Sequence, residues 1–462
     1  MAVVSAEGLR AAEAKMGAAG QPEEAISAFR HAYQRVERGE SAYLRTEDLE
    51  PVTDVARFDE LTEGEVGDAL ERVATIKLNG GLATTMGLRQ PKSLIEARDG
   101  HSFLEIIIGQ LVALRRRYGV RLPLALMNSE ATRAETLAAL EQFPELDVGL
   151  PLEFMQSMIP KLELETLEPV SWPKEPALEW CPPGHGDVYG ALRRSGLLTR
   201  LLEEGFRYAM ISNSDNLGAR VEPRIPAHMA AEGIPFLMEV VEGTGAERKG
   251  GHLARRRADG QIVLRESAQV APEDEQSFSD YRYWHYYNTN NLWIDLAALD
   301  ETLEQTGGVL ELSLIVNRKT VDARDPSSTA VLQLEGAMGS AVQSFPGARL
   351  LCVPRSRFVP VKTTNDLLVL RSDVYTVGDE MLVEPSPKRD GKLPFVDLDK
   401  RFYGVLEEFE RRFPGGAPSL VAAERLVVRG DVTFGAEVAV RGVVELETEE
   451  PLRIEDGSVL GA

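Results

Sequence analysis

The chain has 462 residues, 43% of them hydrophobic, so it can bury a large core and is expected to form two or three domains. Its 73 acidic and 51 basic residues give a formal charge of −22, which argues against nucleic acid and membrane surfaces as partners, since both attract basic proteins. No run reaches the roughly 18 apolar residues of a membrane span, no signal-peptide pattern opens the chain, and two cysteines exclude a disulfide framework, so a cytoplasmic protein is expected.

Residues 1–69 are expected to form an N-terminal helical segment. Ile26, Phe29, Tyr33 and Val36 recur at helical spacing, so their side chains share one apolar face. An amphipathic helix of this kind docks on a larger body through that face. We therefore expect a supporting layer here, with no chemical role.

Residues 70–385 are expected to form one doubly wound α/β domain, because short apolar runs alternate with amphipathic segments, as in a mostly parallel sheet covered on both faces. The helix expected over 103–117 has clear ends, since Ser102 and Glu105 make a capping box and Gly119 can end it. The other expected elements are strands over 73–78, 122–127, 152–155, 208–212 and 235–241, helices over 131–142 and 188–202, and a hairpin turning at Asp259 and Gly260.

The loop that follows the first expected strand carries the strongest chemical signal. Its sequence over 77–93 is KLNGGLATTMGLRQPKS, in which three glycines let backbone N–H groups wrap around a polyphosphate. Lys92 would add a mobile positive charge. The alternative is a plain glycine-rich surface turn. A Walker A loop is excluded, because Lys92 comes five positions after Gly87 instead of directly after it, and the G-x-G-x-x-G spacing of dinucleotide binders is absent.

Two later segments suit the recognition of a nucleotide. Gln156 ends the third expected strand, and its amide offers a donor and an acceptor that complement a uracil edge, although most glutamines are solvated surface residues. His185 lies between two glycines, one of them Gly184, just before an expected helix. There it can touch a phosphate or a sugar hydroxyl, or it can be an ordinary turn histidine.

Asp215 is the best candidate for a metal ligand. It follows the strand expected over 208–212, and open α/β sheets bind their ligands at the carboxyl ends of such strands. A Mg²⁺ ion held by one or two carboxylates and by substrate phosphates needs no denser acidic cluster. The alternative is an Asx-type turn that only ends the strand.

Two further segments are candidates for binding a sugar phosphate. The string YNTNNLWI, residues 287–294, contains three asparagines whose amides can read sugar hydroxyls, although such clusters are often just loops. Lys362 precedes a helix that Thr364 can cap, so the lysine charge and the helix N-terminus would face one point. Taken alone, such a lysine is more often an exposed bystander.

Residues 386–462 are expected to form a linker helix, over 398–412, and a C-terminal β domain. Apolar residues recur every six positions at Val428, Phe434, Val440 and Leu446, with glycines between them. This period favours the short turns of a β-helix over an antiparallel meander.

Several of these strings, in the same order, resemble the eukaryotic-type UTP–glucose-1-phosphate uridylyltransferases, also called UDP-glucose pyrophosphorylases. They are LNGGLATTMG with PKS, PPGHGDV, NTNNLW and the string from Pro360 that reads PVKTTNDLL. The resemblance implies a Rossmann-like, GT-A-like catalytic domain and a left-handed C-terminal β-helix, which in some members mediates homo-oligomers. Ala83 stands where the family usually has glycine, and its methyl group requires a negative φ there.

The resemblance also implies the reaction, Mg²⁺-dependent formation of UDP-glucose and pyrophosphate from UTP and glucose 1-phosphate by in-line attack on the α-phosphate. It assigns catalysis to Lys92 and Lys362, the metal to Asp215, UTP to Leu78, Asn79, Gly80, Gly81, Thr84, Thr85, Lys92, Gln156, Gly184 and Asp215, and the sugar phosphate to His185, Asn213, Gly251, Asn290 and Lys362. The alternatives are a broader UDP-sugar or UDP-N-acetylhexosamine pyrophosphorylase, and a nucleotide-binding regulatory protein without turnover.

Overall fold

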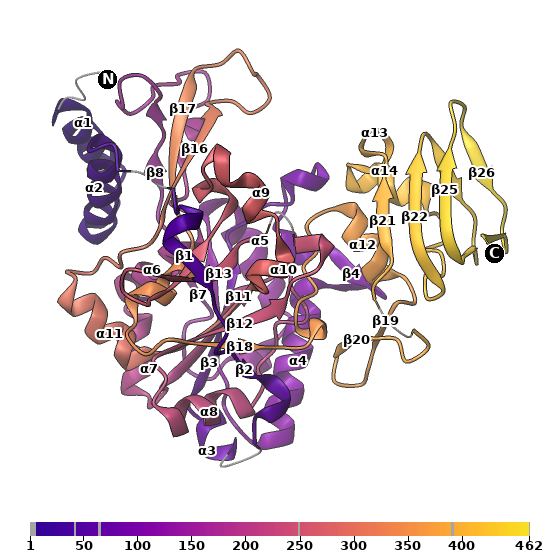
Figure 1. The fold of residues 1–462 in the computed structure, drawn as a ribbon, viewed down its shortest axis with the longest axis horizontal. Coiled ribbons are helices and arrows are strands. Elements are labelled where there is room, and N and C mark those ends of the chain that lie inside the picture. The colour runs from indigo at the N-terminus through magenta and orange to yellow at the C-terminus, as the bar shows by residue number, and fades with distance from the viewer. Residues whose placement is uncertain (1–5, 41–42, 63–65, 248–249, 390–391, 462) are drawn as a thin grey trace.

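The computed structural model describes residues 6–40, 43–62, 66–247, 250–389 and 392–461 (Figure 1). A large mixed sheet forms its centre. The strands follow the order β2 (Ala56–Arg57), β18 (Arg349–Cys352), β12 (Phe236–Glu242), β15 (Tyr286–Asp295), β11 (Tyr208–Asn213), β3 (Val73–Asn79), β6 (Leu124–Asn128) and β7 (Glu153–Met155). Neighbours pair in parallel, except that β15 runs antiparallel to both β11 and β12. The mostly parallel α/β sheet expected from the sequence is thereby confirmed.

The central strands are buried along most of their length, as the apolar runs predicted. In β3 only Leu78 is partly exposed, because helices cover both faces of the sheet. The strand expected at 122–127 begins two residues later, at Leu124. Leu122 has a φ of 36° and precedes a proline, so it cannot take the extended conformation that the ladder requires.

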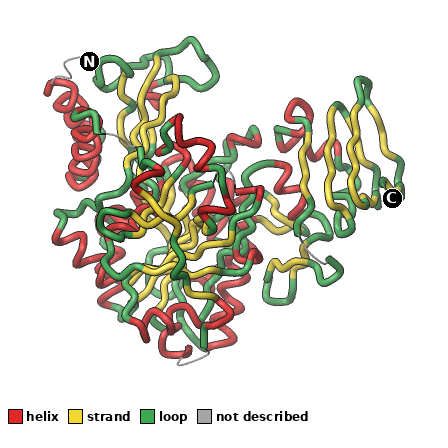
Figure 2. Tube along the Cα trace, viewed as in Figure 1, coloured by secondary structure: helices red, strands yellow, loops and turns green. Residues whose placement is uncertain are grey.

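Helices pack against both faces of the sheet, where strands in yellow lie between helices in red (Figure 2). One face carries α4 (Phe103–Tyr118), α5 (Glu130–Leu140) and α8 (Arg224–Glu232), and the other carries α6 (Val188–Arg194), α7 (Leu197–Glu203) and α11 (Leu296–Gln305). The capping box of Ser102 with Glu105 is formed, and Gly119 ends α4 at a φ of 70°. The single helix expected over 188–202 is wrong, because Gly196 at a φ of 74° divides it into α6 and α7.

The N-terminal helices α1 (Ala6–Ala18) and α2 (Glu23–Glu37) pack on a small outlying sheet (Figure 1). That sheet consists of β9 (Leu162–Glu163), β16 (Leu314–Thr320) and β17 (Ala330–Gly336). The predicted stripe of α2 faces inward, with Ile26, Phe29 and Tyr33 buried. The first 69 residues are not helical throughout, since β1 (Leu49–Pro51) and β2 add two short strands to the central sheet.

The C-terminal part consists of small parallel sheets (Figure 1). They pair β22 (Ala423–Arg429) with β25 (Gly442–Glu447), β23 (Val432–Phe434) with β26 (Leu452–Ile454), and β24 (Ala439–Val440) with β27 (Val459–Leu460). Parallel pairing excludes the antiparallel meander. The six-residue period is also seen in the burial, because Val428, Phe434 and Val440 all lie inside.

The helix expected over 398–412 is wrong. Its first residue ends strand β21 (Phe395–Leu398), which pairs in parallel with β22, and two short helices follow, α13 (Lys400–Tyr403) and α14 (Leu406–Arg412). The carboxylate of Asp399 accepts the N–H of Arg401 and so starts α13 after the strand has ended. The pairing with β22 is a long-range contact that helical spacing cannot reveal.

The C-terminal sheets share one apolar core with the central α/β part. Phe413 stacks on Phe434 with ring centroids 5.0 Å apart, and the same cluster includes Ala83, Met86 and Phe103. Deleting residues from 420 onward would expose Phe413, so we expect aggregation or a changed assembly size in light scattering, with turnover retained in the folded fraction. A soluble protein of unchanged size without activity would contradict this expectation.

Within the described residues, no helix has both the length and the apolar character needed to cross a bilayer. Cys181 and Cys352 are free and buried, in agreement with the interpretation that they are plain interior thiols.

Candidate active site

A cavity of about 300 Å³ opens where β3 and β11 end. Its lining includes most of the residues that the sequence singled out, namely Leu78, Asn79, Gly80, Gly81, Lys92, Gln156, Gly184, His185, Asn213 and Asp215. Ser93, Met127, Pro182 and Ser214 also line it and were not predicted. The position agrees with the rule that open α/β sheets bind ligands at the carboxyl ends of their strands.

Asn79, the last residue of β3, anchors the glycine-rich loop to the protein interior. The buried amide of Asn79 donates to Asn128 Oδ1 at 2.8 Å and to Thr136 Oγ1 at 2.9 Å, so both of its N–H groups serve the protein interior. Gly80 follows, and a Cβ at this position would lie 2.6 Å from Gln156 Oε1. The missing side chain therefore allows the Gln156 amide to lie directly against the loop.

Ala83 takes a conformation that tolerates its methyl group. Its φ is −79°, and the side chain is buried in the core shared with the C-terminal part. The short 3₁₀ helix Thr84–Met86 comes next and ends at Gly87, whose φ is 77°. Thr84 and Thr85 thus lie in this turn, and Thr84, unlike the preceding glycines, does not line the cavity.

Lys92 and Asp215 form an ion pair inside the cavity. Lys92 Nζ lies 2.6 Å from Asp215 Oδ2, and the two side chains are 18% and 20% exposed. The other oxygen, Asp215 Oδ1, is buried and has no hydrogen-bond partner among the described residues. An unpartnered carboxylate oxygen of this kind is a fitting ligand for a hard cation. The described ranges hold no cluster of three or more His, Cys, Asp or Glu that could bind a metal without substrate.

His185 is held as a neutral hydrogen-bond donor. Its Nδ1 accepts the backbone N–H of Met338 at 2.8 Å, so the ring proton lies on Nε2. Burial lowers the pKa of His185 to about 4, and the ring is therefore uncharged at neutral pH. Gly184 before it has a φ of 83°, and a Cβ there would lie 2.7 Å from the Gly336 carbonyl oxygen. Only glycine allows this approach.

The remaining predicted residues, Gly251, Asn290 and Lys362, lie outside the cavity lining. Gly251 faces Glu266, since a Cβ on Gly251 would lie 2.6 Å from the Glu266 carboxyl group. Burial raises the pKa of Glu266, whereas the Lys362 charge and a hydrogen bond from Asn288 lower it. Lys362, Glu266, Asn288 and Gly251 thus form a second polar group, which we call the Glu266 cluster.

Sequence reasoning missed Glu266, although the hairpin contained a signal. The turn at Asp259 and Gly260 sets a register in which His252 pairs with Arg265. In the same register Gly251, the residue before His252, lies opposite Glu266, the residue after Arg265. The hairpin prediction alone could therefore have placed a carboxylate beside Gly251.

The asparagines of β15 divide into two roles. Asn290 lies in a bulge with a φ of 57°, and it exchanges hydrogen bonds with Asn288, from Asn288 Nδ2 to Asn290 Oδ1 at 2.9 Å and from Asn290 N to Asn288 Oδ1 at 2.8 Å. Asn291 points into the interior and is fully buried. Asn288 and Asn290 are partly exposed, so of the three asparagines only these two have surface that a ligand could reach.

Lys362 belongs to the same edge of the sheet as the cavity. The Val361 N–H donates to the Asp215 carbonyl at 3.1 Å, and Pro360 bridges to Asn216. The helix α12 (Thr364–Arg371) begins one residue earlier than expected. Its N-cap is Thr363, not Thr364, because Asp366 completes a capping box with Thr363. Asp366 Oδ2 also accepts the Lys362 N–H at 2.8 Å, which fixes the lysine backbone.

A mostly parallel α/β sheet whose carboxyl edge carries a glycine-rich loop, a lysine–aspartate pair and a neutral histidine defines a nucleotide-binding enzyme of the nucleotidyltransferase class. The family model of UTP–glucose-1-phosphate uridylyltransferase matches residues 26–441, and the chain belongs to this family. Membership gives the activity that the sequence predicted, formation of UDP-glucose and pyrophosphate from UTP and glucose 1-phosphate.

Relatives and solved structures with the same activity in their names match this chain over most of its length. The chain is 39% identical to a probable UTP–glucose-1-phosphate uridylyltransferase of Schizosaccharomyces pombe, with 88% of this chain and 80% of the relative covered. It is 37% identical to the Solanum tuberosum enzyme, with coverages of 94% and 91%. A Leishmania major UDP-glucose pyrophosphorylase variant, solved in complex with UDP-glucose, has a TM-score of 0.93 and 41% identity, with 99% of this chain and 98% of that one covered.

Proposed function

We propose that the cavity binds UTP and that the Glu266 cluster receives glucose 1-phosphate. The observation that carries this assignment is the Lys92–Asp215 pair, which lies in one cavity with the glycine-rich loop and Gln156. The loop N–H groups and Lys92 would hold the phosphates of UTP. His185 and Asn213 line the same cavity and would meet the sugar phosphate where the two substrates adjoin.

The proposed chemistry needs alignment and charge stabilisation more than proton transfer. The phosphate of glucose 1-phosphate is already a nucleophile, so no general base is required, and the neutral Nε2–H of His185 can orient it. Attack at the α-phosphate forms the new P–O bond as the bond to pyrophosphate breaks. Lys92 and Lys362 would stabilise the charge that accumulates on the phosphate oxygens.

We propose Mg²⁺ as the cofactor, held by Asp215 together with phosphate oxygens of the nucleotide. Asp215 Oδ1 suits this role because no described residue donates to it. Bound there, the ion would neutralise charge between the α-phosphate and the leaving group.

Selectivity for uracil is expected to depend on Gln156. A Gln156→Leu variant keeps the side-chain volume but leaves the base edge unpaired, which costs about 1–3 kcal/mol per hydrogen bond. We therefore expect kcat/KM for UTP to fall by about 5- to 150-fold, with little change for ATP, in steady-state assays. Equal turnover of UTP and ATP by the unmodified protein would refute this assignment.

The range of sugars is the point at which the alternatives differ. We propose a preference for glucose 1-phosphate over hexosamine 1-phosphates, supported by the family membership of the chain. Pyrophosphate release measured with UTP, Mg²⁺ and a panel of sugar 1-phosphates tests it. Equal rates across the panel would favour a broad UDP-sugar pyrophosphorylase, and no release with any sugar would favour a regulatory protein.

We further propose a division into an N-terminal part (1–69), a Rossmann-like, GT-A-like catalytic domain (70–385) and a C-terminal part (386–462) in which linker helices precede a left-handed β-helix, in a cytoplasmic protein. The pairing of Val432 with Leu452 and of Ala439 with Val459 supports the β-helix, because the chain returns to the same side after each coil. The edges of the last coil are the proposed surface for homo-oligomers.

A further inference from the structure

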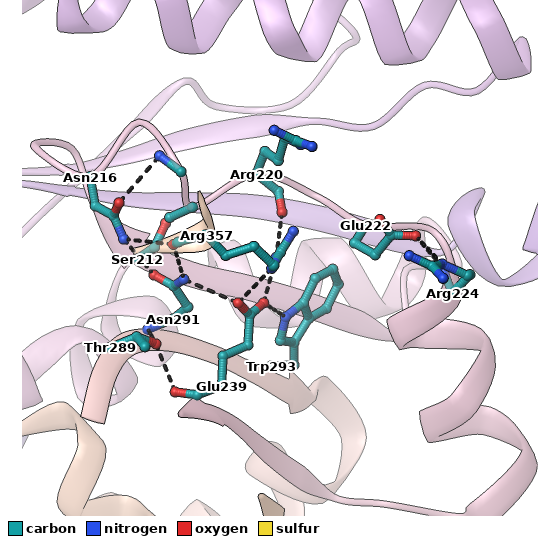
Figure 3. Close-up of polar contacts among 12 residues, drawn as sticks. Ser212, Asn216, Arg220, Glu222, Arg224, Glu239, Thr289, Asn291, Trp293 and Arg357 are labelled. Atoms are coloured by element: carbon teal, nitrogen blue, oxygen red, sulfur yellow. Dashed lines mark hydrogen bonds and ion pairs between the residues drawn. The ribbon is translucent and has the colours of Figure 1, made fainter. Parts of the chain in front are cut away.

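Beside the candidate active site lies a buried polar network that the proposed chemistry does not use (Figure 3). Its centre is the ion pair of Glu239 and Arg357, whose side chains are 0% and 3% exposed. Arg357 donates to both carboxylate oxygens, at 2.8 Å from Nε and 2.5 Å from Nη2. Trp293 Nε1 at 2.9 Å and Asn291 Nδ2 at 3.1 Å complete two donors for each oxygen. The carboxylate is thus fully hydrogen-bonded and has no capacity left for a ligand.

The network continues through the backbone of Arg357 (Figure 3). The Arg357 carbonyl accepts Asn291 Nδ2 at 3.0 Å and Asn216 Nδ2 at 3.3 Å. Asn216 Oδ1 in turn accepts the N–H of Val359 at 2.8 Å. Buried hydrogen bonds therefore join the middle of β12, the middle of β15 and the loop after β11 to Arg357 and Val359.

Asp215 and Lys362, two charged residues of the site, lie next to this network. Val361 donates to the Asp215 carbonyl at 3.1 Å, and Lys362 is the next residue. The backbones are also in close contact, since a Cβ on Gly218 would lie 2.4 Å from the Ser356 carbonyl oxygen. The separation between the Asp215 loop and the Lys362 segment is therefore fixed by both hydrogen bonds and packing.

We infer that the Glu239–Arg357 pair is a positioning device that sets the place of the Lys362 ammonium relative to the Asp215 carboxylate. The inference rests on the proposed function, in which these two groups act on the same phosphates. Glu239 and Arg357 touch no substrate. A buried ion pair contributes little net stability compared with apolar residues of similar volume, but it admits one geometry. A displacement of about 1 Å in a catalytic group can cost on the order of 100-fold in rate.

The test uses the full chain with both charges of the pair removed. Glu239→Gln/Arg357→Met leaves no lone buried charge and keeps an amide oxygen for Trp293. We expect folded protein with unchanged affinity for UTP, because Gln156 and the glycine-rich loop are not bonded to the network, and a kcat lower by about 10- to 100-fold. Arg357→Lys keeps the charge but loses the planar fork, so its kcat should be intermediate. This milder variant also serves if the double variant fails to fold.

Combination with Lys362→Ala separates positioning from general damage. When Lys362 is already alanine, adding Glu239→Gln/Arg357→Met should not lower kcat further, because there is no longer an ammonium group whose position could change. Rate factors that multiply would overturn the inference and leave the role of Lys362 standing. An unchanged kcat in the double variant would overturn it as well. A Lys362→Ala variant with full activity would instead remove the proposed role of Lys362, and the inference with it.

A matched control is available in the C-terminal part. Arg412 Nε lies 2.8 Å from Asp431 Oδ1, and the arginine is mostly buried. Arg412→Met/Asp431→Asn removes a less buried ion pair away from the site and also ends the contact of Arg412 with Glu408, and we expect wild-type kcat at the same assay temperature. An equal fall in kcat for both double variants would assign the effect to lost stability and overturn the inference.

Discussion

Replacing Lys362 by alanine is expected to lower kcat on the order of 10²–10³ while leaving the fold intact. The charge of Lys362 acts on Glu266, and the residue before Lys362 is bonded to Asp215, so in the proposed function the ammonium stabilises the charge that accumulates on the phosphate oxygens during the attack. In a chain of formal charge −22, few groups can offset that negative charge. Steady-state kcat and the thermal midpoint of the same variant provide the measurement.

Two companion variants make this result specific. Lys400 is likewise an exposed lysine at the start of a helix, α13, but it lies in the C-terminal part, so Lys400→Ala should keep wild-type kcat. Lys362→Arg should recover activity only partly, because a planar fork does not replace a compact ammonium. If kcat of Lys362→Ala falls by less than about tenfold, below the range for a preorganised donor, the proposed role of Lys362 is wrong and the catalytic charge must be assigned to Lys92 and the proposed Mg²⁺.

Most of the residues that line the cavity could be predicted because their signals are local. The strand β3 and the loop after it are contiguous, so the glycines, Lys92 and their place at the sheet edge could all be read from one stretch. Asp215 followed from the same rule applied to β11. The direction in which each side chain points could not be predicted from this rule. The sequence predicted that Asn79 contacts UTP. In the structure its side-chain NH₂ group donates to Asn128 and Thr136, which lie 49 and 57 residues further along the chain.

The Glu266 cluster could be predicted only in part from local patterns, and the buried network could not be predicted from them at all. Glu239 and Arg357 are 118 residues apart, and each taken alone resembles an ordinary charged residue. Their meeting depends on β12 pairing with both β15 and β18, which no local period specifies. Lys362 was found only through its motif, and the capping residue was misplaced by one because two threonines stand side by side and Asp366 selects the first.

A large pH effect on stability is expected from Lys77, which lies in β3 three residues before Gly80, the first glycine that follows the strand. Its side chain is 2% exposed, and Nζ donates to Ser212 Oγ at 2.8 Å and to the Ala219 carbonyl at 2.6 Å. Burial, helped by the charge of Arg357 and opposed by Glu239 and Asp215, lowers the pKa of Lys77 from 10.5 to about 7. Between these two values the unfolded chain binds a proton at this lysine that the folded chain does not.

Stability linked to Lys77 must therefore rise with pH from about 7 to 10.5 and stay level below 7. The slope approaches about 1.4 kcal/mol per pH unit above the folded pKa, so the difference in unfolding free energy between wild type and Lys77→Met should shift by about 2 kcal/mol between pH 7 and pH 9, in favour of wild type. Denaturant unfolding at both pH values measures it. The titratable groups that both proteins share cancel in this difference of unfolding free energies, so the shift comes from Lys77 alone. Parallel stability curves would mean that Lys77 stays protonated in the folded chain, and its two hydrogen bonds would then hold a full charge inside the protein.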